Sequence, residues 1–227
     1  MTKLKENKRR LIPRYAVLPL LSVLVMNFVT YYLTSCLTAA RLHVQMALPL
    51  DAQVPFVPAF IVVYILAYGQ WGIGYVLIAR ESEAVGSRIL SGEILAKAIC
   101  LVLFLAVPTT MVRPEVSGRD AFSWLTRPLI YRADAPVNLF PSLHCLASWV
   151  CLRGAWQLKR IGPWYRWVSL VFTLLVCCSV VLVKQHVLVD IPAGILAAEA
   201  GQYLAKKWRT GRFFEFLNRR TARPTAG

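Results

Sequence analysis

The fold is decided by residues 164–205, which read WYRWVSLVFTLLVCCSVVLVKQHVLVDIPAGILAAEAGQYLA. Two apolar runs, near 164–183 and 187–205, are separated only by Lys184, Gln185 and His186. A helix needs roughly 20 mainly apolar residues to cross a bilayer, and a backbone in lipid must satisfy its own hydrogen bonds. We therefore expect two membrane-spanning helices joined by a short polar turn.

The rest of the chain supports the same class of fold. Of the 227 residues, 57% are hydrophobic, and the mean hydropathy of +0.54 is too high for an ordinary soluble domain. No second domain or repeat is evident. The predicted fold is an all-α integral membrane bundle of six transmembrane helices, near 15–37, 54–79, 89–112, 142–158, 164–183 and 187–205.

The chain ends are interpreted as basic tails. The first apolar run is too long for the core of a signal peptide and lacks a small-residue cleavage site, so we interpret it as a membrane anchor. This gives three segments: a basic cytoplasmic N-terminal tail (1–14), a six-helix membrane domain (15–205) and a basic cytoplasmic C-terminal tail (206–227).

The net charge of +15 is explained by topology. With six crossings, the basic residues of both tails and of two short loops fall on one side, which the positive-inside rule makes cytoplasmic. They also suit contact with anionic lipid headgroups, whereas this sorting by loop does not indicate nucleic-acid binding. These residues are Lys3, Lys5, Lys8, Arg9, Arg10 and Arg14; Arg80, Arg88, Lys159, Arg160 and Arg166; and Lys206, Lys207, Arg209, Arg212, Arg219, Arg220 and Arg223.

The cysteines do not indicate a disulfide framework or a metal site. All six fall inside expected spans, where cysteine behaves as a small apolar side chain, and no CxxC or Cys/His zinc spacing occurs. We therefore predict no metal and no cofactor. The cysteines are Cys36, Cys100, Cys145, Cys151, Cys177 and Cys178.

The long segment 113–141 joins the third and fourth expected helices on the outer, extracytoplasmic or lumenal, face. Connections of this length are commonly functional, and aromatic residues favour the membrane interface, so we expect a re-entrant or interfacial piece here. Its apolar residues are Phe122, Trp124, Leu125, Leu129, Ile130 and Tyr131.

Polar residues from three places are expected to meet on that outer face. The candidate residues are Arg113 at the end of the third helix, Ser142 and His144 at the start of the fourth, and Lys184, His186 and Asp190 at the start of the sixth. His43, the remaining histidine, falls in the first outer loop.

Structural roles are open for several of these residues. Arg113 could be a boundary arginine that snorkels to headgroups, Ser142 a helix N-cap, and His144 an interfacial histidine. His186 and Asp190 are four apart and share a helix face if the helix begins by residue 186. Ionisable pairs at a membrane boundary are costly and therefore indicate function.

The combination suits phosphoryl transfer. A carboxylate fixes the tautomer of a neighbouring histidine, and a second histidine can act as a general acid. The guanidinium of Arg113, with Lys184 and the N–H groups at a helix start, matches the oxygens of a phosphate group. We therefore expect a metal-free site for a lipid phosphate or pyrophosphate.

FPSLH at 140–144 and KQHVLVDIPAG at 184–194 together resemble the type 2 phosphatidic acid phosphatase superfamily. Its three blocks are Lys-x6-Arg-Pro, Pro-Ser-x-His and Ser-Arg-x5-His-x3-Asp. The matching positions are Arg113 and Pro114; Pro141, Ser142 and His144; and Ser179, His186 and Asp190.

The resemblance implies a role for each matched residue. His186 is the expected nucleophile that forms a phosphohistidine, and Asp190 orients it. His144 protonates the leaving oxygen, while Arg113 and Ser142 hold the phosphate oxygens. No metal is needed, and water or another hydroxyl resolves the intermediate.

Two departures put the acceptor in doubt. Ala106 stands at the lysine position of the first block, and Val180 at the arginine position of the third. Lys184 is a candidate to replace one missing cation. The pattern DxPxNxFPSLH, with Asp134 and Asn138, looks closer to a branch resembling inositol phosphorylceramide synthases.

The predicted function is therefore a metal-independent membrane lipid-phosphate phosphatase acting at the extracytoplasmic face. One alternative is a phosphotransferase that moves a phospho-headgroup between a phospholipid and a lipid hydroxyl. Another is a non-catalytic transporter or lipid-binding subunit, in which the histidines are structural.

Four other acidic or basic residues carry structural expectations. Asp51 is expected to cap the second helix. Glu93 and Lys97 are expected to form an ion pair along the third helix. Glu199 is either buried and protonated, paired with an inner cation, or part of a polar cavity.

Overall fold

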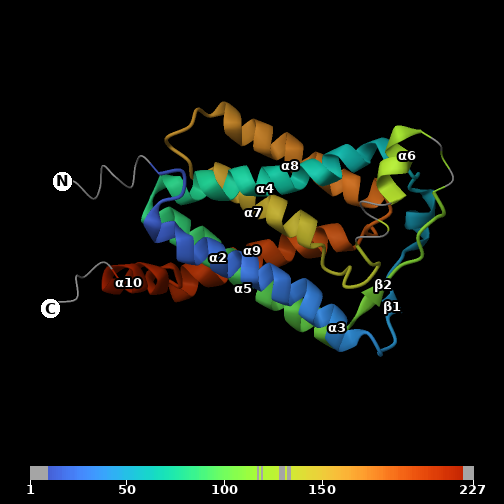
Figure 1. The fold of residues 1–227 in the computed structure, drawn as a ribbon, viewed down its shortest axis with the longest axis horizontal. Helices are drawn as coiled ribbons and strands as arrows, with labels where there is room; N and C mark the ends of the chain where they lie inside the picture. Colours follow the sequence, from blue (N-terminus) through green and yellow to red (C-terminus); the bar gives the residue numbers. More distant parts are fainter. Residues whose placement is uncertain (1–9, 117, 119, 128–130, 132–133, 222–227) are drawn as a thin grey trace.

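The computed structural model describes residues 10–116, 118, 120–127, 131 and 134–221, and its helices form one bundle (Figure 1). Lys3, Lys5, Lys8 and Arg9 of the expected N-terminal tail, Arg223 of the C-terminal tail, and Leu129 and Ile130 of the outer segment lie outside these residues. The long elements are α2 (Arg14–Phe28), the π-helix η1 (Val29–Leu33), α3 (Thr34–Thr38), α4 (Ile61–Glu81), α5 (Glu83–Ala106), α7 (Leu143–Ala155), α8 (Trp164–Leu182), α9 (Asp190–Trp208) and α10 (Gly211–Thr221).

Short elements lie at the outer end of the bundle, which is the end opposite α10 and the start of α2 in Figure 1. They are the strands β1 (Val44–Gln45) and β2 (Thr109–Thr110), which pair in parallel, the 3-10 turns η2 (Pro49–Gln53) and η3 (Pro58–Phe60), and the helix α6 (Ala121–Thr126). α6 falls in the segment 113–141 and exposes Phe122 and Trp124. A re-entrant or interfacial position for this segment stays a prediction.

Four stretches in the described part of the chain are long and apolar enough to cross a membrane: Arg14–Thr38, Pro58–Glu81, Glu83–Ala106 and Trp164–Leu182. They expose large apolar side chains such as Leu24, Ile73 and Val171. Surfaces of this kind suit lipid and are rare on soluble monomers. These features support an all-α membrane protein.

The other two expected spans differ from this pattern. α7 has 13 residues, about 20 Å of helix, whereas a bilayer core is about 30 Å thick. α9 has 19 residues but carries Asp190, Glu199, Lys206 and Lys207. Apolar length alone therefore does not confirm the six predicted crossings, which stay a prediction.

Small residues bring α5 and α9 into close contact. A Cβ atom built on Gly201 of α9 lies 2.3 Å from the carbonyl oxygen of Gly92 on α5, and 2.6 Å from the backbone nitrogen of Ala96. Only glycine allows this approach. The expected Glu93–Lys97 ion pair is confirmed on the same stretch of α5, with Nζ 2.8 Å from Oε1 and both side chains buried.

The C-terminal part contains more helix than expected. Within the segment 206–227, α9 continues to Trp208, and α10 packs against α5 and α2. Glu199 is partly exposed, with Oε1 3.2 Å from Nε of Arg153. Of the three alternatives for Glu199, pairing with a cation at the inner end is therefore correct, although Glu199 also lines a cavity there.

Candidate active site

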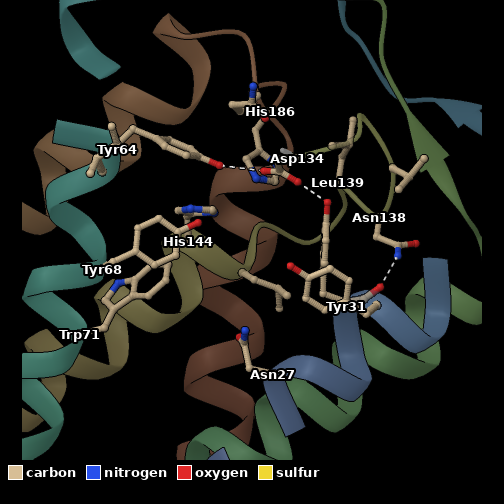
Figure 2. A pocket seen from close by; sticks show the side chains of 15 residues that line it. Asn27, Tyr31, Tyr64, Tyr68, Trp71, Asp134, Asn138, Leu139, His144 and His186 are labelled. Carbon is tan, nitrogen blue, oxygen red and sulfur yellow. Dashed lines mark hydrogen bonds between the residues drawn. The ribbon is translucent and has the colours of Figure 1, made fainter. Parts of the chain in front are cut away.

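A cavity of about 280 Å³ opens at the outer end of the bundle (Figure 2). Its walls come from α2 and η1, from α4, from the segment before α7, from the start of α7 and from the turn before α9. The lining residues are Asn27, Tyr31, Tyr32, Tyr64, Ile65, Tyr68, Trp71, Asp134, Val137, Asn138, Leu139, Leu143, His144, Gln185 and His186.

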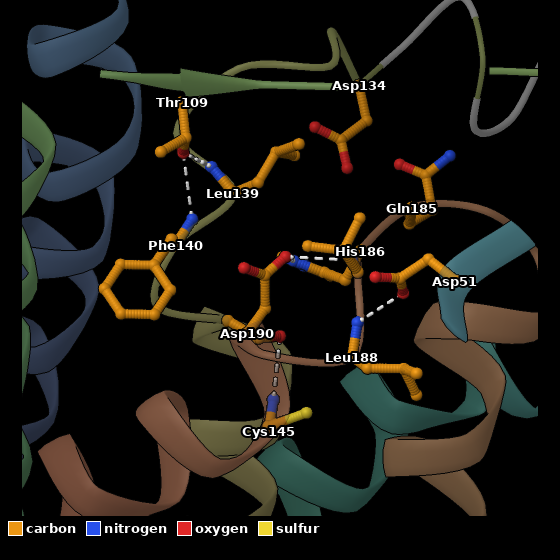
Figure 3. A network of polar contacts seen from close by, with 12 residues as sticks. Asp51, Thr109, Asp134, Leu139, Phe140, Cys145, Gln185, His186, Leu188 and Asp190 are labelled. Atoms are coloured by element: carbon orange, nitrogen blue, oxygen red, sulfur yellow. Dashed lines mark hydrogen bonds and ion pairs between the residues drawn. The ribbon is translucent and has the colours of Figure 1, made fainter. Parts of the chain in front are cut away.

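The segment preceding α7 is fixed by hydrogen bonds to distant parts of the chain. Thr109 Oγ1 accepts from the backbone N–H groups of Leu139 and Phe140 at 2.9 and 3.0 Å (Figure 3). Asn138, which adopts a φ of 54°, donates from Nδ2 to Thr34 Oγ1 at 2.9 Å and to Ser35 Oγ at 2.8 Å. These contacts place the Pro-Ser-x-His stretch at the cavity.

The first turn of α9 packs directly on the first turn of α7. The N–H of Ser142 donates to the carbonyl of Asp190 at 3.2 Å, and a Cβ atom on Gly194 would lie 2.4 Å from the carbonyl oxygen of Ser142. Because glycine permits this contact, the two sequence blocks, about 45 residues apart, meet at one place.

His186 and Asp190 form a buried pair at that place. Nδ1 of His186 lies 3.0 Å from Oδ2 of Asp190, which also accepts the N–H of Val187 at 3.0 Å (Figure 3). His186 is 8% exposed and Asp190 is fully buried.

The pair is made by a turn and not by a helix. The condition that the helix begins by residue 186 is not met, because α9 begins at Asp190. The chain turns at Lys184, where φ is 55°, and the carbonyl of Val180 accepts the N–H groups of both Gln185 and His186. This turn brings the imidazole back onto the carboxylate.

The hydrogen bond to Asp190 defines which nitrogen of His186 can react. An ionised carboxylate only accepts hydrogen bonds, so Nδ1 is the donor and carries the proton. Nε2 then keeps its lone pair, and the ring lines the cavity. This arrangement is the one required of a histidine that acts as a nucleophile or a base.

His144 lies across the cavity within a group of aromatic rings (Figure 2). Its ring stacks on Tyr64 with centroids 4.3 Å apart and meets Tyr68 and Trp71 at 5.6 and 5.1 Å. Its centroid is 6.1 Å from that of His186. Nε2 of His144 is buried and has no hydrogen-bond partner among the described residues, which leaves it free to meet a bound group.

Asp134 spans the outer side of the cavity. One carboxylate oxygen accepts from the hydroxyl of Tyr31, and the other accepts from the hydroxyl of Tyr64 at 3.1 Å (Figure 2). Asp134 therefore links η1 to α4 in the wall of the cavity that both histidines line.

Arg113 lies beside the cavity, bound to two of the segments that line it. Its Nη1 donates to the carbonyl of Asp134 and its Nη2 to Oε1 of Gln185, both at 2.6 Å. Burial lowers the pKa of the guanidinium, and the nearby Asp134 carboxylate opposes that shift. Nε is buried without a partner among the described residues.

The expectation that Arg113 lies at the end of the third helix is wrong, and the structure does not favour its alternative role as a boundary arginine. α5 ends at Ala106, so Arg113 lies in the following segment and not at the helix end. The guanidinium is half-buried on protein acceptors, which does not fit a boundary arginine that reaches out to headgroups.

The side chains of Ser142 and Lys184 make hydrogen bonds to the backbone outside the cavity. Oγ of Ser142 accepts the N–H of Cys145 at 3.3 Å, so its N-cap role is confirmed. Nζ of Lys184 donates to the carbonyls of Asp51 at 3.3 Å and Val54 at 2.5 Å. Neither side chain lines the cavity, and phosphate binding by either stays a prediction.

Asp51 connects two outer segments. Its Oδ2 accepts the N–H of Leu48 and its Oδ1 that of Leu188, both at 2.7 Å. The expectation that Asp51 caps the second helix is wrong, because it lies in η2 and α4 begins ten residues later. It supports the turn that carries His186.

The structure thus brings His144, His186 and Asp190 together, places Arg113 next to them and leaves His43 outside the cavity. Sequence reasoning missed Tyr31, Tyr68, Trp71 and Gln185. Only Gln185 had a usable signal, its place beside His186; the aromatic residues look like ordinary parts of apolar helices.

Fold and cavity together define a helical membrane protein with a histidine–carboxylate pair facing a second histidine at one end of the bundle. The family model described as "PAP2 superfamily" matches residues 36–204. This covers well over half of the chain, and the chain therefore belongs to the PAP2 superfamily, whose members are generally phosphatases or phosphotransferases. No curated protein and no solved structure matches the chain.

Proposed function

We propose that the protein is a metal-independent lipid-phosphate phosphatase that works through a phosphohistidine at His186. The observation that carries this proposal is the pairing of His186 Nδ1 with the buried carboxylate of Asp190, while the ring lines a cavity. In this arrangement Nε2 is a nucleophile whose ring is held in place before substrate binds.

The first chemical step forms a bond from Nε2 of His186 to phosphorus and breaks the bond from phosphorus to the leaving oxygen. His144 gives a proton to that oxygen, which departs as the lipid alcohol, or as a lipid phosphate where the substrate is a pyrophosphate. Asp190 stabilises the positive charge on the imidazole as the new bond forms.

The second step releases inorganic phosphate. Water forms a bond to phosphorus, the bond from phosphorus to Nε2 breaks, and His144 accepts a proton from the water. The guanidinium of Arg113 can turn from Gln185 towards the phosphoryl oxygens and stabilise their negative charge. Stabilisation of that charge accounts for much of the catalysis in phosphoryl transfer.

A lipid substrate fits the surroundings of the cavity. Tyr32, Ile65 and Tyr68 form its wall on the side of η1 and α4, and Tyr32 and Tyr68 are more than half exposed. An acyl or prenyl chain can remain in the bilayer beside these residues while the headgroup reaches the histidines. By the positive-inside rule, the basic residues at the opposite end favour an extracytoplasmic position for this cavity and a cytoplasmic position for both termini.

A phosphotransferase is the second candidate, and Asp134 favours it. A carboxylate in the wall of the cavity repels a phosphate dianion but accepts hydrogen bonds from hydroxyl groups. The absence of the family's cations at Ala106 and Val180 acts in the same direction. A lipid hydroxyl, as in a phosphorylceramide-synthase-like reaction, then replaces water in the second step.

The test is an assay of purified protein in detergent with phosphatidic acid, phosphatidylglycerophosphate and polyprenyl pyrophosphate. We expect phosphate release that survives EDTA, is lost in His186→Ala and is retained in His43→Ala, which removes a histidine outside the cavity. No release, but headgroup transfer from a phospholipid to a lipid alcohol, indicates the phosphotransferase. Activity retained by His186→Ala refutes both, and no reaction with any substrate supports a non-catalytic transporter or lipid-binding subunit.

A further inference from the structure

A second polar cavity, of about 220 Å³, lies at the opposite end of the bundle from the histidines. It is formed by α5 near its start and by α7 and α9 near their ends. Its lining residues are Arg88, Ile89, Arg153, Gln157, Glu199, Gln202, Tyr203 and Lys206.

The charges in this cavity do not balance. Glu199 is its one carboxylate, and Oε1 of Glu199 is shared between Nε of Arg153 at 3.2 Å and Nε1 of Trp149 at 2.7 Å. Among the described residues, the guanidinium of Arg88 makes one long hydrogen bond, from Nη2 to Oε1 of Gln157 at 3.5 Å. Within the described part of the chain, neither Arg88 nor Lys206 has a carboxylate partner.

The floor of the cavity is rigid. Gln202 is 7% exposed and donates from Nε2 to the carbonyl of Ile89 at 2.9 Å. It sits beside the close α5–α9 contact at Gly92, where an added Cβ atom would lie 2.5 Å from Nε2 of Gln202. Arg88 on α5 and Lys206 on α9 are therefore carried by two helices that are in direct contact.

The cavity is too far from the histidines to belong to their site. Lys206 follows Asp190 by 16 residues of α9, about 24 Å of helix. Arg153 likewise lies near the end of α7, whereas His144 lies at its start. The cavity lies at the end of the bundle where α5 begins and α9 ends (Figure 1), and the positive-inside rule assigns this end to the cytoplasmic leaflet.

An apolar helix surface runs from the cavity towards the membrane centre. Tyr203 and Leu196 are seven residues apart on α9, so they share one face, and they are 63% and 68% exposed. If the cations bind the phosphate of a phospholipid, the acyl chains of that lipid can lie against this face. Basic pockets between membrane helices on the cytoplasmic side commonly hold anionic headgroups.

We propose that this cavity, formed by Arg88, Arg153 and Lys206, binds the phosphate of an anionic phospholipid from the inner leaflet. The proposal does not depend on the reaction at His186. It assigns an anion site in addition to the general attraction of the basic tails for the membrane.

The experiment measures phosphatidylglycerol binding to detergent-purified protein by native mass spectrometry, with phosphatidylcholine as the neutral comparison. Each surface cation contributes about fivefold in affinity for an anionic lipid. We therefore expect the double variant Arg88→Gln, Lys206→Gln to bind phosphatidylglycerol about 25-fold more weakly than the wild type. Lys206→Gln alone, at an exposed position, is expected to weaken binding about fivefold and covers the case in which the double variant does not fold.

The matched control is Lys159→Gln, Arg160→Gln, which removes one lysine and one arginine at the same end but outside the cavity. We expect it to keep wild-type affinity, and we expect the same of His186→Ala. The proposal is overturned if the control loses as much affinity for phosphatidylglycerol as the double variant. It is also overturned if neither Lys206→Gln nor the double variant loses affinity. Loss in His186→Ala assigns the lipid to the other cavity. Displacement by inorganic phosphate at comparable concentration shows a site for the free anion and overturns the lipid assignment.

Discussion

Two buried polar pairs in this protein have the same sequence spacing and nearly the same contact distance. Glu93 and Lys97 are four residues apart on α5 at 2.8 Å, and His186 and Asp190 are four residues apart before and at the start of α9 at 3.0 Å. All four side chains are buried. By sequence spacing alone, either pair is a candidate for function.

The surroundings separate the two pairs. Glu93 and Lys97 line neither the cavity of the histidines nor the cavity at the opposite end of the bundle, and Oε1 of Glu93 also accepts the hydroxyl of Tyr75 at 2.5 Å. His186, in contrast, places one edge on its carboxylate and the other edge in a cavity that holds a second histidine. Access to a cavity, and not burial or pair geometry, therefore distinguishes the candidate reactive pair from the structural one.

The strongest test of this difference is His186→Ala. We expect turnover to fall by about ten-thousandfold or more, because no other described group lies on Asp190 with a nitrogen lone pair facing the cavity. The measurement is phosphate release or headgroup transfer at saturating substrate. Thermal unfolding of the variant, compared with His43→Ala, shows whether the loss is chemical or structural.

Asp190→Asn comes next. The amide keeps the size of the side chain but can donate to Nδ1, which moves the proton of His186 to Nε2 and removes the nucleophile's lone pair. We expect turnover to fall by roughly a thousandfold with little change in KM. A variant with unchanged turnover would show that Asp190 only holds the turn, through its bond to the N–H of Val187.

Arg113→Lys is expected to have a smaller effect. The guanidinium contacts the carbonyl of Asp134 and Oε1 of Gln185 at once, and an ammonium group lacks that planar fork. We expect about tenfold loss of kcat/KM. Arg127→Lys, a change of the same kind outside the cavity, serves as the matched control and is expected to retain activity.

Tyr31→Phe removes one of the two hydroxyls that bind Asp134. The hydrogen bond from η1 to the Asp134 carboxylate is lost, whereas the hydrogen bond from Tyr64 remains. We expect KM to change by a few-fold, in proportion to a single hydrogen bond, with turnover nearly unchanged. A large fall in turnover instead would indicate that Asp134 takes part in the reaction.

The sequence predicts the helices well because apolar run length decides them. The spans near 15–37, 54–79 and 164–183 lie within a few residues of Arg14–Thr38, Pro58–Glu81 and Trp164–Leu182. α5 differs more, because it starts at Glu83 with Ser82 as its N-cap and stops at Ala106. Ser82 is a common type of N-cap residue and could be recognised in the sequence, but a hydropathy profile does not detect capping residues.

The site is only partly predictable for a physical reason. His144, His186 and Asp190 follow from their spacing, since α7 and α9 must both begin at the outer end. The direction of the Lys184 side chain depends on its positive φ, which hydropathy and spacing do not reveal. The tyrosines around His144 depend on how α4 packs against α7, which is a tertiary contact with no local signal.

Lys97→Met, with the smallest expected effect on turnover, completes the comparison. Removing one partner of a buried pair leaves Glu93 as an uncompensated charge, so we expect the free energy of unfolding to fall by about 3–5 kcal/mol. Turnover per folded molecule should stay within twofold of the wild type, since the pair does not line the cavity of the histidines. Glu93→Gln, Lys97→Met, which removes both charges, should recover much of that stability. If the double variant regains stability but has lost turnover, the Glu93–Lys97 pair serves the reaction, and access to a cavity does not distinguish the two pairs.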